Sequence, residues 1–141
     1  MVFHDDIRNW HGRWHPKYIF VEHLEKNNEK IRLSANSFHG KIIASKLKEI
    51  DVLDLSKSKN LAFYFSEGLA LSNYQFLKYF TEDKSNSIKK INLISDNKDE
   101  VKELQAMIEG TFMARDLVNE PLSYLTALQY SKDMEKMAKQ V

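Results

Sequence analysis

Hydrophobic positions along the chain fall into short continuous runs separated by longer stretches of helical period. Three of the runs are short: residues 17–23 (KYIFVEH), which combine β-branched and aromatic side chains, 52–55 (VLDL) and 91–95 (INLIS). Runs of this length and composition predict buried strands. We therefore expect three strands, each followed by a helix.

The stretches between and after these runs have apolar residues at helical spacing. The spacing predicts helices over about 29–50, 61–79, 98–119 and 127–141. The second stretch is apolar around most of its circumference, which predicts a largely buried helix containing Phe76. The fourth is expected to run to the last residue.

Polar residues with capping chemistry precede these helices. Asn27 or Asn28 is a suitable N-cap for the first helix. Asn97 with Glu100, and Thr126 with Gln129, have the spacing of capping boxes. Proline at position 121 ends the third helix because it cannot continue the hydrogen-bond ladder.

The alternation of strand and helix predicts the fold class. Crossovers of this length permit parallel pairing, so we expect an α/β fold with a small mixed or parallel sheet and helices on both faces. Residues 1–16 mix aromatics, histidines and charges without a period and end at Pro16. They are expected to form an irregular lead-in.

Composition narrows the function classes. The 141 residues are 43% hydrophobic, enough for a core, and carry 21 basic against 20 acidic side chains, for a formal net charge of +1. Such a balance argues against nucleic acid or an anionic membrane as the main partner. Because the chain has no cysteine, disulfides, thiolate metal sites and a cysteine nucleophile are excluded. With no signal-peptide or membrane-spanning pattern, we expect a cytoplasmic protein.

Residues with metal-ligand chemistry gather near the start of the chain. They are His4, Asp5, Asp6, His11 and His15. Two of the histidines have the i, i+4 spacing that places imidazoles on one helical face, but Gly12 and Pro16 argue against a helix there. A site needs several converging ligands, so we assign no metal to this cluster and leave its role open.

The remaining candidates for chemistry are interpreted as structural. His23 and His39 are single histidines without an identifiable serine or aspartate partner. The glycines are isolated, whereas a phosphate-binding loop needs them grouped at a strand-to-helix turn. A set of aromatic residues accompanied by a single lysine is more typical of core packing than of base stacking: Tyr64, Tyr74, Phe76 and Tyr79. The sequence thus gives no catalytic, cofactor-binding or metal-binding residue.

Two stretches nevertheless resemble a known family. Residues 114–121 (ARDLVNEP), followed by Leu125 and Thr126, are similar to the ARDLVN-x-P-x-x-x-LT stretch of the leucyl aminopeptidase (cytosol aminopeptidase) family. That stretch lies where the N-terminal domain of the family meets the catalytic domain. Residues 67–79 (EGLALSNYQFLKY) resemble the EG-x-x-L-x-x-Y-x-F-x-x-Y helix of the same N-terminal domain. The resemblance covers residues 61–137.

The resemblance implies a domain organisation. Residues 1–97 would form a shortened, macro-domain-like N-terminal α/β domain, and residues 98–141 a linker helix and first helix leading into a catalytic domain that is absent from the chain. In the family, two divalent metal ions (zinc or manganese) and their ligands lie in that catalytic domain, in motifs such as NTDAEGR. None of these motifs occurs here. Because hydrolysis by a metal-activated water requires clustered ligands, the chain alone is expected to hold no peptidase site and no cofactor.

Two function hypotheses follow, and a third is weaker. In the first, the chain is the non-catalytic N-terminal part of a metal-dependent aminopeptidase that removes N-terminal amino acids from peptides. The resemblance then implies hexamers, in which this part contacts its own catalytic domain and other subunits and shapes access to the active sites. The second is a free-standing macro-like interaction or small-ligand module without peptidase activity. The third is an enzyme that uses the early His and Asp cluster, which lacks converging ligands.

The end of the chain carries an expectation of its own. Residues 109–141 offer more apolar surface than a terminal helix pair normally leaves in water. We expect this segment either to be weakly ordered after Pro121 or to bury its apolar face against another copy of the chain.

Overall fold

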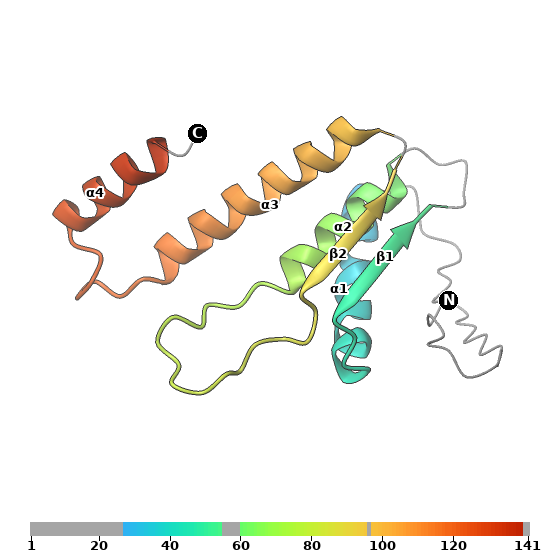
Figure 1. The fold of residues 1–141 in the computed structure, drawn as a ribbon, viewed down its shortest axis with the longest axis horizontal. Coiled ribbons are helices and arrows are strands. Elements are labelled where there is room, and N and C mark those ends of the chain that lie inside the picture. Colours follow the sequence, from blue (N-terminus) through green and yellow to red (C-terminus); the bar gives the residue numbers. More distant parts are fainter. Residues whose placement is uncertain (1–26, 55–59, 96, 140–141) are drawn as a thin grey trace.

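A computed structural model describes residues 27–54, 60–95 and 97–139 of the chain. Helices and strands follow one another in the order α1, β1, α2, β2, α3 and α4 (Figure 1). Their bounds are α1 Asn28–Ala44, β1 Glu49–Leu53, α2 Leu61–Ser72, β2 Lys90–Ile94, α3 Lys98–Asn119 and α4 Ala127–Ala138. The strand predicted over 17–23, which contains His23, and the lead-in over 1–16 lie outside the described residues.

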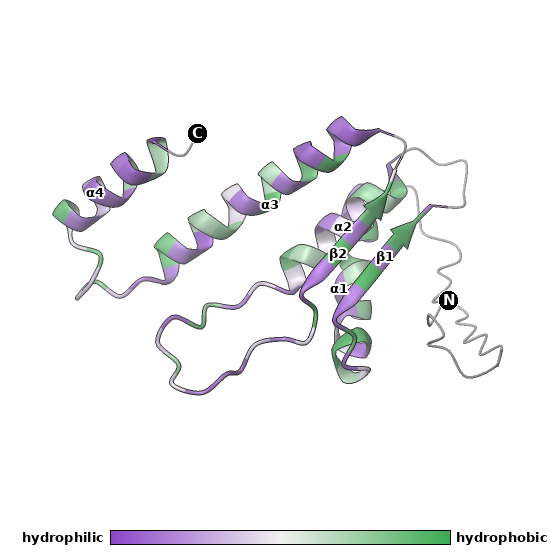
Figure 2. Ribbon diagram, in the orientation of Figure 1, coloured by the Kyte–Doolittle hydropathy of each residue, from purple (hydrophilic) through white to green (hydrophobic). Residues whose placement is uncertain are grey.

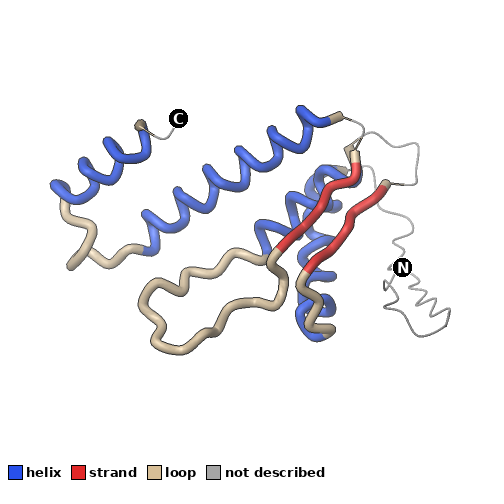
Figure 3. The backbone as a smooth tube through the Cα atoms, in the orientation of Figure 1, coloured by secondary structure: helices blue, strands red, loops and turns tan. Residues whose placement is uncertain are grey.

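The described sheet consists of β1 and β2, which pair in parallel as predicted (Figure 3). Ile50 lies opposite Ile91, and Val52 lies opposite Leu93. Because successive side chains of a strand point to opposite faces, these four residues share one face of the sheet. The crossover through α2 is what permits parallel pairing of consecutive strands.

The first helix is shorter than predicted. It ends at Ala44, and Lys46 reverses the chain with a left-handed backbone (φ 53°). Leu47 and Ile50 continue the apolar period, but they pack on the core from a turn and from β1. The period therefore reflected a shared core and not a continuous helix, and the prediction of a helix to residue 50 was wrong.

The second helix also ends early, at Ser72 instead of residue 79. Asn73 ends it: its backbone N–H bonds to the carbonyls of Ala70 and Leu69, and its side-chain Nδ2 donates to the carbonyl of Ile88 at 3.1 Å. The chain then runs as a long loop to β2 (Figure 3). Phe76 lies half-buried in that loop, so its predicted place in a buried helix was wrong.

The core lies between α1, α2 and one face of the sheet (Figure 1). Ala35 of α1 and Leu69 of α2 have no exposed surface. The buried residues of the core are Ala35, Phe38, Ile42, Leu69 and Ile88, with Ile43, Leu47, Ile50, Phe65 and Ile91 packed against them. Burial of these side chains is the main stabilising contribution available to the domain.

Residues 67 and 68, which begin the family-like stretch 67–79, lie where α1 and α2 cross. Glu67 is 7% exposed, and its Oε2 accepts a hydrogen bond from Nε of Arg32 in α1 at 2.8 Å. A Cβ at position 68 would lie 2.7 Å from the Cα and carbonyl oxygen of Arg32. The two helices can approach this closely because residue 68 is a glycine.

Among the described residues, the opposite face of the sheet carries mainly polar side chains. It carries a polar cluster in which Glu49 accepts hydrogen bonds from Lys90 (2.8 Å) and Asn92 (2.9 Å), and Asn92 also donates to Asp51. Within the described residues, α1 and α2 thus cover one face of the sheet.

Two helices follow β2. Hydrophobic and hydrophilic residues alternate along both (Figure 2). α3 packs beside α2 and buries Leu104, and it spans the predicted residues from its N-cap Asn97 onward. α4 buries none of its described residues and ends at Ala138, before the predicted last residue. In the described ranges, no helix is both long and apolar enough to cross a membrane.

Candidate functional site

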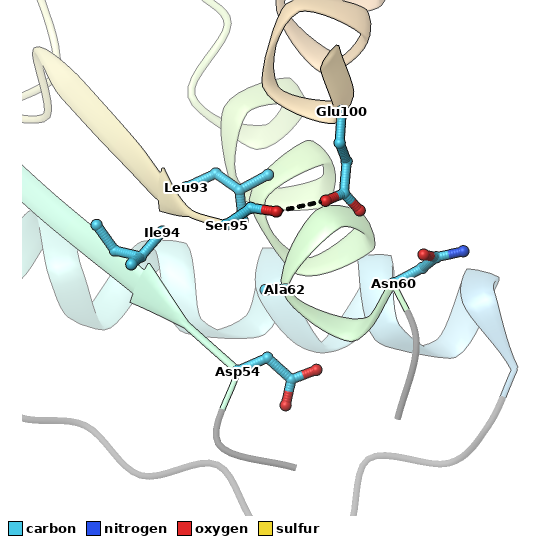
Figure 4. A pocket seen from close by; sticks show the side chains of 7 residues that line it. All are labelled: Asp54, Asn60, Ala62, Leu93, Ile94, Ser95 and Glu100. Atoms are coloured by element: carbon cyan, nitrogen blue, oxygen red, sulfur yellow. Dashed lines mark hydrogen bonds between the residues drawn. The ribbon is translucent and has the colours of Figure 1, made fainter. Parts of the chain in front are cut away.

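A pocket lies where β1 and β2 end, and its lining comes from β2, from the residues that follow the two strands and from the starts of α2 and α3 (Figure 4). Its volume is about 210 Å³, and its lining residues are Asp54, Asn60, Ala62, Leu93, Ile94, Ser95 and Glu100. The carboxyl ends of parallel strands are where open α/β sheets commonly bind ligands. Its position makes this pocket a candidate ligand site.

The side chains of the pocket favour ligands that carry hydrogen-bond donors over ligands that are anionic. Asp54 and Glu100 supply carboxylates, and the hydroxyl of Ser95 donates to Oε2 of Glu100 at 2.7 Å. Carboxylate oxygens accept hydrogen bonds from hydroxyl or amine groups and repel phosphates. Among the residues that the structure describes, no group of three or more His, Asp or Glu side chains is placed to hold a metal ion.

A second site joins the two family-like stretches. The hydroxyl of Tyr74, in the loop after α2, donates to Oδ1 of Asp116 at 2.8 Å and accepts from Nδ2 of Asn119 at 3.1 Å. Its ring packs against Phe112 of α3 with the centroids 5.1 Å apart. This tyrosine thus fastens the loop to the last turns of α3.

A lysine and another tyrosine of the same loop meet the end of α3. Nζ of Lys78 forms an ion pair with Glu120, and the hydroxyl of Tyr79 donates to the other carboxylate oxygen. The side chain of Glu120 is 7% exposed, although the lysine is 42% exposed. Nζ of Lys78 also lies 3.8 Å from the centroid of the Tyr124 ring, a cation–π distance. The lysine therefore contacts two points of the segment that follows α3.

We call these residues the junction clamp: Tyr74, Lys78 and Tyr79 on the loop, and Asp116, Asn119, Glu120 and Tyr124 on α3 and the segment after it. Arg115 extends the contact, because its Nη1 donates to the carbonyl of Leu71 at 2.8 Å and so satisfies a carbonyl at the end of α2.

The charges of the junction clamp shift the ionisation of its members. Burial raises the pKa of Glu120, but the hydrogen bonds from Lys78 and Tyr79 outweigh burial, so the pKa is lowered overall. Conversely, the bond to Glu120 raises the pKa of Lys78. Burial, followed by its donation to Asp116, raises the pKa of Tyr74. At neutral pH Glu120 is therefore ionised, and the hydroxyls of Tyr74 and Tyr79, whose pKa values are raised, stay protonated.

The structure places one of the histidines considered from sequence. Nε2 of His39 lies 3.1 Å from Oδ1 of Asn73, so this histidine holds the residue that ends α2, which agrees with a structural role. His4, His11, His15 and His23 lie outside the described residues. The sequence did not reveal that Lys78 and Glu120 meet, because they are 42 residues apart. Their membership of two family-like stretches was the available signal.

No family profile matches the chain. A probable cytosol aminopeptidase of Clostridium tetani is 40% identical over 77 residues, which are 50% of this chain and 16% of that protein. A probable cytosol aminopeptidase of a Sulfurihydrogenibium species is 29% identical over 114 residues, which are 70% of this chain and 23% of that protein. The chain thus spans less than a quarter of the length of these relatives.

Solved structures agree on the fold. A mutant of tomato leucine aminopeptidase superposes on 79% of this chain with a TM-score of 0.67 and 16% identity, covering 25% of that protein. The bottromycin maturation enzyme BotP in complex with Mn superposes on 81% of this chain, with a TM-score of 0.65, 20% identity and 25% of that protein covered. The resemblance of this chain to an N-terminal portion of leucyl aminopeptidases is therefore confirmed.

Proposed function

Because the chain resembles an N-terminal portion of cytosol aminopeptidases, we propose that it is the non-catalytic N-terminal part of a metal-dependent, cytoplasmic leucyl aminopeptidase. The whole enzyme would remove N-terminal amino acids from peptides. The observation that carries the proposal is the junction clamp, in which the two stretches that resemble the family bind each other.

The proposal includes a division of the chain. Residues 1–97 form the α/β domain, with a shortened macro-like sheet that α1 and α2 cover on one face. Residues 98–141 form the linker helix and the first helix of the catalytic domain. In support, α3 begins directly after β2, and α4 follows the junction clamp with no described residue buried.

The two metal ions of such an enzyme would be held by its catalytic domain. The described residues of this chain do not fit a two-metal centre, because the pocket offers two carboxylates and Glu100 already accepts a hydrogen bond from Ser95. A metal-activated water needs more ligands than these. We assign this chain a role in assembly, contacting its own catalytic domain and other subunits of a homo-oligomer, and in shaping access to the active sites.

An assay of the purified chain tests the non-catalytic role. Release of a chromophore from leucine p-nitroanilide, with Mn²⁺ or Zn²⁺ added, should not exceed a buffer control. Turnover that copurifies with the chain and is removed by a chelator would contradict the proposal.

The coding region beyond residue 141 allows a second test, in which activity is expected. If it encodes carboxylate-rich metal-binding motifs, expression of the longer protein should give metal-dependent turnover in the same assay. A stop codon at that point would instead favour a separate module.

The pocket at the strand ends favours one alternative, a small-ligand module without peptidase activity. Its carboxylates suit a ligand with hydroxyl or amine groups. NMR titration with glucosamine and with ethanolamine tests this alternative. Saturable shifts of the Ser95 and Glu100 signals, lost in Glu100→Gln, would support it, and no shifts at millimolar ligand would exclude it for these two compounds.

A further inference from the structure

The segment between α3 and α4 is short and changes the direction of the chain. α3 ends at Asn119, and Glu120 has an extended backbone (φ −67°, ψ 131°). The backbone N–H groups of Tyr124 and Leu125 both bond to the carbonyl of Pro121 at 2.9 Å, which closes a turn. Thr126 then caps α4 by accepting from the N–H of Gln129 at 3.2 Å. The path of this segment sets where α4 points.

One side chain outside the segment contacts it at two places. The ammonium of Lys78 binds the carboxylate of Glu120, before the turn, and lies over the ring of Tyr124, inside the turn. We infer that Lys78 is a positioning residue that fixes the direction of α4 relative to the α/β domain by holding Glu120 and Tyr124 together. The inference goes beyond the proposed function and does not depend on it.

The surroundings make this contact stronger than a typical surface ion pair. An exposed ion pair contributes little because water screens it and two long side chains lose freedom. Here the carboxylate of Glu120 is 7% exposed and accepts from Tyr79 as well, so its orientation is already fixed before the lysine binds. Because the carboxylate is already ordered, less conformational entropy is lost when the lysine binds it.

The position of α4 depends on this contact because packing does not supply an alternative. No described residue of α4 is buried. Nearby apolar residues of the segment and of α4 are largely exposed, with Leu122 90% and Leu128 68% exposed. Loss of the Lys78 contacts should therefore release α4 while leaving the core around α1, α2 and the sheet intact.

The test measures the distance between α1 and α4. Because the chain has no cysteine, spin labels can be attached to Asn36→Cys on α1 and Lys132→Cys on α4, both exposed positions, and their separation measured by double electron–electron resonance. Dilution with unlabelled chain removes distances between molecules. We expect a single narrow distribution in the otherwise unaltered chain.

The variants separate the charge of Lys78 from its bulk. Lys78→Met keeps an unbranched stem and removes both contacts, so its distribution should broaden at least twofold in width. Lys78→Arg restores a cation and should recover a narrow distribution. Lys84→Met is the matched control, because Lys84 lies in the same loop but its Nζ faces Phe80, 5.1 Å from the ring centroid.

Two outcomes would overturn the inference. One is a distribution for Lys78→Met as narrow as that of the unaltered chain. The other is loss of the whole fold in Lys78→Met, seen as loss of cooperative urea unfolding, because the residue would then support the domain and not the direction of α4. Tyr124→Leu, which removes the ring contact alone, should give an intermediate width and keeps the test informative.

Discussion

Gly68 shows how one residue permits two helices to cross at close range. The space for its side chain is occupied by the backbone of Arg32, with the Cα and carbonyl oxygen 2.7 Å from where a Cβ would be. Backbone atoms of a packed helix cannot move aside as a flexible side chain can. The sequence showed an isolated glycine in a helical pattern, and it gave no sign of a helix crossing at that point.

We predict that Gly68→Ala destabilises the domain by about 1–3 kcal/mol, the usual cost of overpacking a filled core. The matched control is Gly40→Ala in α1, where nothing lies within 4 Å of the added Cβ, so removing a helical glycine should stabilise by about 0.5–1 kcal/mol. Urea unfolding of both variants measures the difference. Equal effects of the same sign would contradict the close crossing of α1 and α2.

Glu120 makes the stability of the junction clamp depend on pH. Its folded pKa is lowered, so it contributes stability above its unfolded pKa of about 4.3. That contribution is lost as the pH falls through the still lower folded pKa. The raised pKa of Lys78 has no effect in this window, because the lysine stays protonated in both states.

In Glu120→Gln the free energy of unfolding should therefore fall less between about pH 5 and pH 3 than in the unaltered chain. The measurement is the urea midpoint at a series of pH values, with Glu103→Gln, an exposed position on α3, as the control. If the slopes of Glu120→Gln and the unaltered chain coincide, the carboxylate is not linked to folding.

Among single residues, the sequence predicted the N-caps of α1, α3 and α4 correctly. The side chains of Asn27, Asn97 and Thr126 accept hydrogen bonds from backbone N–H groups at the starts of α1, α3 and α4. A cap depends on residues two or three positions away, so its signal is local. The pairs Arg32 with Glu67 and Lys78 with Glu120 depend on partners 35 and 42 residues away, which no local pattern encodes.

At the scale of elements, sequence predicted the kind and order of the described helices and strands, but not where α1 and α2 end, and it placed β1 three residues late, at 52 instead of Glu49. Both ends were placed too late because apolar side chains beyond each helix point to the same core or to α3. Leu47 packs from a turn, and Tyr74 packs on Phe112 from a loop. Periodicity reports which residues face a common surface, and it does not report whether the backbone between them is helical.

α4 is the element most dependent on its own sequence, because none of its described residues is buried. A helix of 12 residues is marginal without packing, so its N-cap matters more than usual. Thr126→Ala should cost α4 about 1 kcal/mol. Hydrogen exchange should show faster exchange of α4 amides with those of α1 unchanged, and Ser131→Ala, on the exposed surface of α4, serves as the control. Unchanged protection of α4 would contradict the role of the cap.

At the scale of the whole molecule, the resemblance of two stretches identified the relatives, and the structure explains the pairing of those stretches. Asn119 and Glu120 belong to one stretch and bind Tyr74 and Lys78 of the other. The sequence therefore predicted the parallel α/β arrangement and the relatives. It did not predict the polar face of the sheet, because the first described strand was expected over 52–55, whereas the alternation that places Glu49 and Asp51 on one face begins at residue 49.

The exposed apolar surface after α3 leads to the last prediction. Val118 is 84% exposed, Leu122 90% and Leu128 68%. In a solution of the purified chain, the available cover for such a surface is a second copy. We predict a dimer that buries more than about 1,000 Å² through these residues, the size that separates specific interfaces from crystal packing.

Light scattering over a concentration series measures this association. Leu122→Ser with Leu128→Lys should shift the chain to the monomer, and at protein concentrations too low for the dimer it should leave the urea midpoint unchanged, because both side chains are exposed in the folded chain. Leu33→Ser, which alters a 55% exposed leucine on α1, is the matched control and should leave the dimer intact. An unaltered chain that stays monomeric up to about 1 mM, a concentration at which even a weak specific contact is populated, would show that this surface does not bind a second copy.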